Sequence, residues 1–206
     1  MSTARVVLLS GPSGAGKSRL ARRLREAHGW PVVRLDDFYK DGDDPTLPMS
    51  TLGIPDWDDV RSFRLEAAVE ALDTLCRTGT VAVPTYDIAT SRATGTTEVR
   101  TDGAPCVVAE GIFAADVIAP LRERGLLHAA YCVRQGAWVT FARRLARDLS
   151  ERRKPPWVLL RRGLRLRAAE RGIVAEQARL GARPASPREV ERALGTVRVE
   201  PQTDAG

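Results

Sequence analysis

The chain has 206 residues, 43% of them hydrophobic, which is enough for one α/β domain with a sizeable core. Its formal net charge is +6, from 32 Lys or Arg against 26 Asp or Glu. No apolar run reaches about 18 residues, no leader pattern precedes the first predicted strand, and the three cysteines lack metal-ligand spacing. We therefore expect a cytoplasmic protein with no membrane span and no disulfide framework.

The first predicted elements are a strand and a helix joined by a glycine-rich loop. Residues 5–10 are apolar and β-branched, which predicts a buried strand, and residues 18–27 have helical composition. Between them, Gly-Pro-Ser-Gly-Ala-Gly-Lys-Ser fits the phosphate-loop pattern G-x-x-x-x-G-K-[ST] at every fixed position. The alternative is a glycine-rich turn without a ligand. The loop residues expected to bind the nucleotide are Gly11, Ser13, Gly14, Ala15, Gly16, Lys17 and Ser18.

Each group of this loop has an expected task. Glycines let successive backbone N–H groups face phosphate oxygens, and the start of the helix adds its own unpaired N–H groups. Lys17 is expected to contact the β- and γ-phosphates, and the Ser18 hydroxyl to hold Mg²⁺. The loop therefore predicts ATP and Mg²⁺ as cofactors but does not say what the phosphate is for.

A second predicted strand, residues 32–36, ends in Asp36 and Asp37, and a loop rich in Asp, Pro and Gly follows over residues 38–59. A long loop in a compact domain is usually functional. Ligands of parallel sheets bind at the carboxyl ends of strands, so Asp36 is a candidate to accept a proton from an attacking hydroxyl. The alternative is that the two acids cap a loop or a helix.

The later segments alternate between helical and strand patterns. Residues 63–76 predict a helix that Gly79 ends, and residues 81–88, broken at Pro84, with 96–101 predict a hairpin flap over about residues 81–102. The other predicted elements are buried strands at 106–109 and 129–133, helices at 116–124, 137–150, 157–180 (interrupted near Gly163 and Gly172) and 187–194, and an edge strand at 197–200. The alternation predicts an α/β, three-layer fold with a mainly parallel sheet in a single domain, residues 1–206, and the phosphate loop indicates a P-loop NTPase fold.

Acids, arginines and aromatic residues supply the other candidates. Glu110 ends a predicted strand and, with Ser18 and Asp36, is a candidate Mg²⁺ ligand. Residues 143–183 hold 13 Lys or Arg against 4 Asp or Glu. This Arg-rich segment predicts a lid over about residues 143–156 that stabilises charge on the transferring phosphoryl group. A solvated helix face is the alternative. Aromatic side chains beside acids, which can stack a flat ring, are Tyr39, Trp57, Phe63 and Tyr86, with a core role equally open for Phe63.

Taken in order, these motifs resemble the uridine kinase (uridine–cytidine kinase) family of P-loop small-molecule kinases, related to phosphoribulokinase and bacterial pantothenate kinase. The resemblance covers most of residues 4–155. The residues that carry it are the phosphate loop, Leu35-Asp36-Asp37-Phe38-Tyr39, Asp56-Trp57-Asp58, Pro84-Thr85-Tyr86-Asp87, Glu110-Gly111-Ile112 and the segment from Arg143 to Arg152. It implies a five-stranded parallel sheet with helices on both faces and a hairpin flap.

The resemblance also implies roles for single residues. Lys17, Asp36 and Arg147 would be catalytic, with Asp36 orienting the attacking 5′-hydroxyl. The substrate would contact Asp36, Tyr39, Trp57, Asp58, Tyr86 and Arg144, and ATP would contact Arg152 and Lys154 besides the phosphate loop.

One segment departs from the family pattern. Family members usually carry a His shortly after Tyr-Asp that contacts the pyrimidine, whereas residues 88–92 are Ile-Ala-Thr-Ser-Arg. We therefore expect a kinase that phosphorylates a primary hydroxyl of a small molecule. Uridine or cytidine is the first candidate acceptor, and pantothenate, a sugar or another nucleoside are alternatives. A P-loop ATPase or switch with a macromolecular partner is the alternative in another class. We expect no membrane or nucleic-acid partner, and a homo-oligomer stays open because family members often form one.

Overall fold

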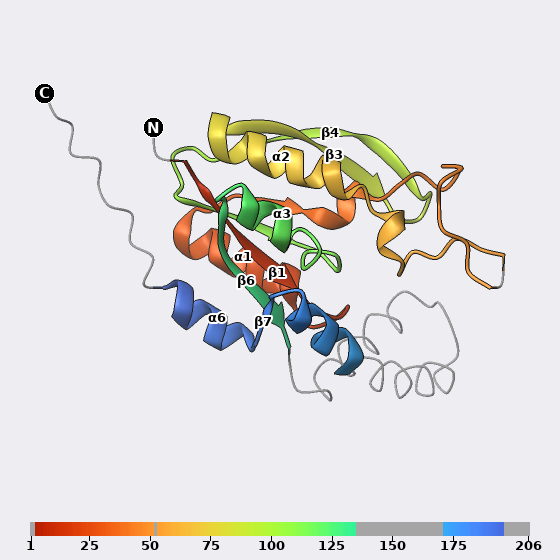
Figure 1. The fold of residues 1–206 in the computed structure, drawn as a ribbon. Helices are drawn as coiled ribbons and strands as arrows, with labels where there is room; N and C mark the ends of the chain where they lie inside the picture. Colours follow the sequence, from red (N-terminus) through yellow and green to blue (C-terminus); the bar gives the residue numbers. More distant parts are fainter. Residues whose placement is uncertain (1–2, 52, 135–170, 196–206) are drawn as a thin grey trace, which may run out of the picture.

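The computed structural model describes residues 3–51, 53–134 and 171–195, and Figure 1 shows its arrangement. The large sheet has five strands: β1 (Arg5–Ser10), β2 (Val32–Arg34), β5 (Cys106–Glu110), β6 (Leu127–Val133) and β7 (Arg183–Ala185). The helices are α1 (Lys17–His28), α2 (Leu65–Thr78), α3 (Ile118–Glu123), a helical stretch over 171–179 and α6 (Pro187–Leu194), with 3₁₀ turns η1 (Leu35–Phe38) and η2 (Val60–Ser62).

All neighbouring strands of the large sheet are parallel, in the order β2-β5-β1-β6-β7. The chain leaves β1 toward β5 and β2 on one side and reaches β6 and β7 on the other. The strand order therefore reverses at β1, and in such sheets ligands bind at the carboxyl ends beside the reversal. The phosphate-loop sequence follows β1 at this point.

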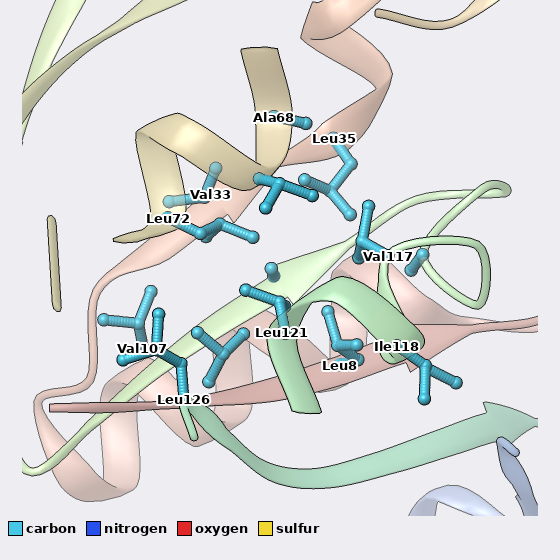
Figure 2. Close-up of a cluster of buried hydrophobic side chains, with 14 of the residues drawn as sticks. Leu8, Val33, Leu35, Ala68, Leu72, Val107, Val117, Ile118, Leu121 and Leu126 are labelled. Carbon is cyan, nitrogen blue, oxygen red and sulfur yellow. The ribbon is translucent and has the colours of Figure 1, made fainter. Parts of the chain in front are cut away.

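Alternating side chains of the strands build two cores. Val6 and Leu8 of β1 face one core, and Val7 and Leu9 face the other. In the first core α2 and α3 cover the sheet: Figure 2 shows Leu72 of α2 beside Val33 and Leu121 of α3 beside Leu8. In the second core α1 and α6 cover the opposite face. This confirms the predicted three-layer α/β architecture, which fixes the strand ends that carry the candidate site.

A separate two-stranded antiparallel hairpin consists of β3 (Thr80–Asp87) and β4 (Arg92–Arg100) and lies along α2 (Figure 1). It confirms the predicted flap. The prediction that Pro84 interrupts the first strand is wrong, because β3 continues through Pro84, which pairs with Thr96. A two-stranded hairpin has free edges, where a proline without an N–H is tolerated.

Local signals set most element ends. Gly79 closes α2 in a left-handed conformation, and α6 begins with a capping box in which Ser186 and Glu189 exchange side-chain and backbone bonds. Two elements differ from the predictions. The second strand stops at Arg34 rather than Asp36, and β7 was not predicted. Gly172 itself lies in the helical stretch over 171–179, and the residues before 171 lie outside the described ranges.

The predicted buried thiols are confirmed: Cys106 and Cys132 lie in the core, and Cys76 is buried as well. Among the described residues no helix is both long and apolar enough to cross a membrane. The predicted helix at 137–150 and the edge strand at 197–200 lie outside the described residues.

Candidate active site

The phosphate-loop sequence forms the turn between β1 and α1. Gly11, Gly14 and Gly16 all have positive φ angles, of 133°, 81° and 94°. At Gly11 an added Cβ would lie 2.4 Å from the carbonyl oxygen of Val133 at the end of β6. Only glycine combines this backbone angle with this close approach. The three glycines thus let the chain turn tightly at the edge of the sheet, and α1 begins directly after the last of them.

Lys17 is the first residue of α1 and is buried, with 7% of its surface exposed. Its Nζ donates to the carbonyl oxygens of Gly11 at 2.8 Å and Pro12 at 3.3 Å. These bonds hold the ammonium group across its own loop. A phosphate oxygen is a stronger partner for an ammonium than a neutral carbonyl, so the arrangement suits an anionic ligand.

Glu110 ends β5 beside the phosphate loop, with 4% of its surface exposed. The register places it opposite Leu9 of β1 and Arg34 of β2, so three strand ends meet here. Burial raises the pKa of Glu110 most, and the nearby Asp36 charge raises it further. A hydrogen bond from Ser18 and the charges of Lys17 and Arg34 oppose this shift. The fold therefore brings together all three predicted magnesium residues, Ser18, Asp36 and Glu110.

These residues fit a magnesium ion that is shared with a nucleotide. Within the described residues no group of three or more His, Cys, Asp or Glu is placed to hold a metal ion by itself. Mg²⁺ usually takes one or two protein carboxylates and completes its octahedron with water and substrate phosphates. A hydroxyl and two carboxylates at the mouth of a phosphate loop match that donor set.

Asp36 lies in η1, just past the end of β2, and is half-buried. Its Oδ1 accepts a hydrogen bond of 3.1 Å from the backbone N–H of Ile112, in the turn after β5. The contact needs glycine at the neighbouring position, since a Cβ on Gly111 would lie 2.8 Å from the same Oδ1 and 2.9 Å from the Cβ of Leu35. The turn after β5 therefore sets the position of the Asp36 carboxylate.

The adjacent acid has a different environment. Asp37 is buried, forms an ion pair of 3.3 Å with Arg34, and accepts a 3.4 Å hydrogen bond from the N–H of Tyr86 in the hairpin. Burial raises the pKa of Asp37, while Arg34 and the Tyr86 N–H lower it. Asp37 thus joins η1 to the hairpin, a structural role that differs from the capping role left open for the two acids.

Four aromatic rings gather next to Asp36. Tyr39 lies at the centre, with ring centroids 5.7 Å from Trp57, 6.0 Å from Tyr86 and 5.9 Å from Phe113. Its hydroxyl donates to the Trp57 carbonyl at 3.3 Å. Burial raises the pKa of Tyr39, and the charges of Asp36 and Asp58 raise it further. Tyr39 and Trp57 of the loop and Tyr86 of the hairpin, which the sequence predicted as site residues, therefore lie together, close enough to the acids Asp36 and Asp58 to feel their charge.

Phe113 was not predicted, because it follows the Glu110-Gly111-Ile112 motif in an apolar stretch that has no chemical signal of its own. Phe63 is buried in the core and packs on Phe113 at 5.6 Å between ring centroids. Its core role, one of the two left open, is the one observed.

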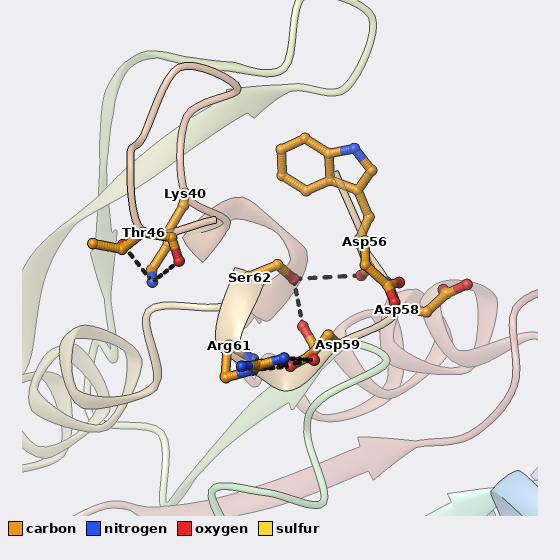
Figure 3. Close-up of polar contacts among 8 residues, drawn as sticks. Lys40, Thr46, Asp56, Asp58, Asp59, Arg61 and Ser62 are labelled. Atoms are coloured by element: carbon orange, nitrogen blue, oxygen red, sulfur yellow. Dashed lines mark hydrogen bonds and ion pairs between the residues drawn. The ribbon is translucent and has the colours of Figure 1, made fainter. Parts of the chain in front are cut away.

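Most acids of the loop over residues 38–59 are bonded within the protein. Figure 3 shows Asp59 paired with Arg61, whose two nitrogens approach the carboxylate at 2.7–3.1 Å, and Asp56 near Asp58. Asp56 accepts from the Asp58 N–H at 3.2 Å, and Asp44 accepts from Thr46. By contrast, the Asp58 carboxylate and the second oxygen of Asp36 have no bonding partner among the residues that the structure describes. They are the acids left to meet a ligand.

The tip of the hairpin is tied to the same loop. The Gly42 N–H donates to the Ser91 carbonyl at 2.7 Å, Asp41 accepts from the Ala93 N–H at 2.7 Å, and Arg92 pairs with Asp43 at 2.8 Å. The Tyr86 hydroxyl donates to the Lys40 carbonyl at 3.0 Å. Loop and hairpin thus form one wall of the candidate site. The predicted lid residues Arg144, Arg147, Arg152 and Lys154 lie outside the described residues.

Comparisons with known proteins concern the family and the fold of the chain. The model of the phosphoribulokinase/uridine kinase family matches residues 6–155. A proposed fructose transport system kinase from Silicibacter sp. TM1040 shares 20% sequence identity, with a TM-score of 0.57 over 91% of this chain and 89% of that one. A possible uridine kinase from Bacillus stearothermophilus shares 16% identity, with a TM-score of 0.49 over 82% and 85%. No curated protein matches the chain.

Proposed function

The chain belongs to the phosphoribulokinase/uridine kinase family and is therefore a P-loop kinase that uses ATP; on this premise we propose that it phosphorylates a primary hydroxyl of an uncharged small molecule. The first acceptor we propose is the 5′-hydroxyl of uridine or cytidine. The observation that carries the proposal is the meeting of Asp36 with Lys17, Ser18 and Glu110 at three strand ends.

On the phosphate side, the residues supply positioning and charge. Lys17 and the amides of the glycine loop would hold the β- and γ-phosphates, since Lys17 already lies across that loop. Ser18 and Glu110, with Asp36 acting through bound water, would hold Mg²⁺, which neutralises charge that develops on the β- and γ-phosphates. Arg147, Arg152 and Lys154 are proposed to close over the nucleotide.

On the acceptor side, Asp36 is proposed to orient the attacking hydroxyl and accept its proton. Its Oδ1 is held by the Ile112 N–H, which leaves Oδ2 for the hydroxyl. Tyr39, Trp57 and Tyr86 would pack on the ring of the acceptor, and Asp58 would accept hydrogen bonds from its other hydroxyls. Arg144 is the remaining proposed contact.

The charge of this wall supports an uncharged acceptor. Asp36 and Asp58 both act on Tyr39, and both have carboxylate oxygens without a bonding partner in the described part of the chain. The nearby Arg34 and Arg61 are each paired with an acid, Asp37 and Asp59. Within the described residues a phosphate or carboxylate on the acceptor would therefore meet the negative charges of Asp36 and Asp58, whereas hydroxyls are good donors to carboxylates.

A sugar is the second candidate acceptor, and the sequence of the turn between the two hairpin strands supports this alternative. The turn over residues 88–91 carries Ile88, Ala89, Thr90 and Ser91 where related kinases have a base-contacting His. Asp87 and Thr90 bond to each other within this turn, and Ser91 bonds to Gly42. The turn therefore offers no imidazole to a pyrimidine.

The test is ADP release by the purified protein with ATP and Mg²⁺ over a panel of acceptors, with Asp36→Ala as the control. The panel holds uridine, cytidine, purine nucleosides, neutral sugars, pantothenate and a sugar phosphate. Turnover with a neutral acceptor that Asp36→Ala abolishes supports the proposal, and the acceptor used decides between nucleoside and sugar. Turnover only with pantothenate or the sugar phosphate contradicts the charge argument. Hydrolysis that needs no acceptor and survives Asp36→Ala contradicts the kinase assignment.

A further inference from the structure

The helical stretch over residues 171–179 reaches the candidate site through one side chain. Gln177 is buried, with 7% of its surface exposed, while its neighbours Glu176 and Ala178 are exposed. Its Nε2 donates a 3.1 Å hydrogen bond to the carbonyl oxygen of Ile112. Ile112 is the residue whose N–H donates to Asp36. One backbone residue is therefore bonded on one side to Asp36 and on the other to Gln177.

The Gln177 amide is held in one orientation, and this orientation leaves its buried oxygen in an unfavourable position. A backbone carbonyl only accepts, so Nε2 must face Ile112. This leaves Oε1 buried, and among the described residues it has no hydrogen-bond partner. An apolar side chain of similar shape would avoid an unpaired buried carbonyl, which is unfavourable. A role for the donor on Nε2 would account for an amide at this position.

The helix that carries Gln177 is well anchored. Val174 and Leu180 pack against the core that also contains Phe113 and Ala114, and the Gln177 carbonyl accepts from the Ala182 N–H at 3.0 Å just before β7. A donor fixed to the core in this way can hold the turn after β5 in place. The turn itself has little room, as the close approach of Gly111 to Asp36 shows.

We propose that Gln177 is a positioning residue for the phosphoryl-transfer reaction: by holding the Ile112 carbonyl it fixes the N–H that orients the Asp36 carboxylate. This inference rests on the proposed function, in which Asp36 orients the attacking hydroxyl. Gln177 would not contact the acceptor, so its loss should lower turnover more than it changes binding of either substrate.

The test is a double-mutant cycle between Gln177→Leu and Asp36→Asn, measured as kcat at saturating ATP and acceptor. Gln177→Leu should lower kcat about tenfold, as supporting residues around a reactive group commonly do, and leave both KM values within about twofold. In the Asp36→Asn background, where orienting the carboxylate no longer matters, Gln177→Leu should change the residual rate by less than about twofold. Thermal unfolding should change little, because Gln177→Leu removes one unpaired carbonyl, the side-chain Oε1, but leaves the Ile112 carbonyl without its donor.

Two further variants complete the test, one as a second substitution of Gln177 and one as a control at the neighbouring position. Gln177→Asn keeps an amide but is too short to bond Ile112, so it should reproduce the loss if Gln177→Leu folds poorly. Glu176→Leu introduces the same side chain one position earlier, where the residue is exposed and paired with Arg179, and should leave kcat unchanged.

The remaining outcomes contradict either the positioning role of Gln177 or the proposed role of Asp36. Full kcat in both Gln177 variants, or an equal loss in the Asp36→Asn background, would overturn the positioning role while leaving the proposed function intact. Full turnover by Asp36→Asn alone would instead overturn the proposed role of Asp36, and the Gln177 inference with it.

Discussion

Replacing Gly111 by Ala tests how the candidate base is positioned. The added Cβ would lie 2.8 Å from Oδ1 of Asp36, which is 0.6 Å inside the 3.4 Å at which ordinary van der Waals contact begins. It would also lie 2.9 Å from the Cβ of Leu35, a buried core residue. Leu35 cannot retreat far, so η1 and the carboxylate must shift by several tenths of an ångström.

The expected effect follows from that shift. Displacing a reacting group by about 1 Å can cost on the order of 10²-fold in rate, so kcat should fall by about 10- to 100-fold. Overpacking of this kind typically destabilises by about 1–3 kcal/mol, so the fold should persist. The KM for ATP should change little, because the phosphate loop is formed by other residues.

The assay is ADP release at saturating substrates, with thermal unfolding measured in parallel. The matched control is Gly172→Ala, since an added Cβ there meets no described residue within 4 Å and Gly172 lies in a helix, where Ala is favoured over Gly. If Gly111→Ala retains wild-type kcat while Gly172→Ala does as well, the Asp36 carboxylate does not depend on this contact, and the reasoning is refuted.

Lys17→Ala should lower kcat by about 10²- to 10³-fold in the same assay while circular dichroism stays unchanged, and near-normal turnover would remove the phosphate-loop assignment. Asp58→Asn should raise the KM for the acceptor about tenfold and spare kcat, as expected for a bond made equally before and during the reaction; a lower kcat with normal KM would argue for a chemical role. Burial, with a smaller contribution from the Glu176 charge, raises the pKa of Asp116, so the folded state keeps this proton at pH values where the unfolded chain has lost it. Stability should therefore decline as the pH rises above the unfolded pKa, and Asp116→Asn should raise the melting temperature at pH 8 but not near pH 4; equal shifts at both would contradict this.

The sequence by itself determined the parts that depend on local patterns. The continuous apolar run of β1 predicts a buried strand, and the glycines of the phosphate loop predict a tight turn, which the structure forms with positive φ angles. The ends of α2 and α6 follow from Gly79 and from the Ser186-Pro187 start, because caps act within a few residues of the chain. These features need no knowledge of distant neighbours.

The family resemblance assigned the catalytic role to Asp36, but only the tertiary structure shows how the surroundings of the two adjacent acids differ. Asp36 and Asp37 look alike in sequence, but Asp37 is taken up by Arg34 and Tyr86 while Asp36 meets the Ile112 N–H, a partner 76 residues away. In the same way β7 is a three-residue strand containing Pro184, which has no strand pattern and exists because β6 offers it a partner. No sequence pattern marks Gln177 as a functional residue, and its role follows only from the hydrogen bond between its amide and the Ile112 carbonyl. Such contacts join segments far apart along the chain, and local propensity does not encode which distant groups will meet in the folded molecule.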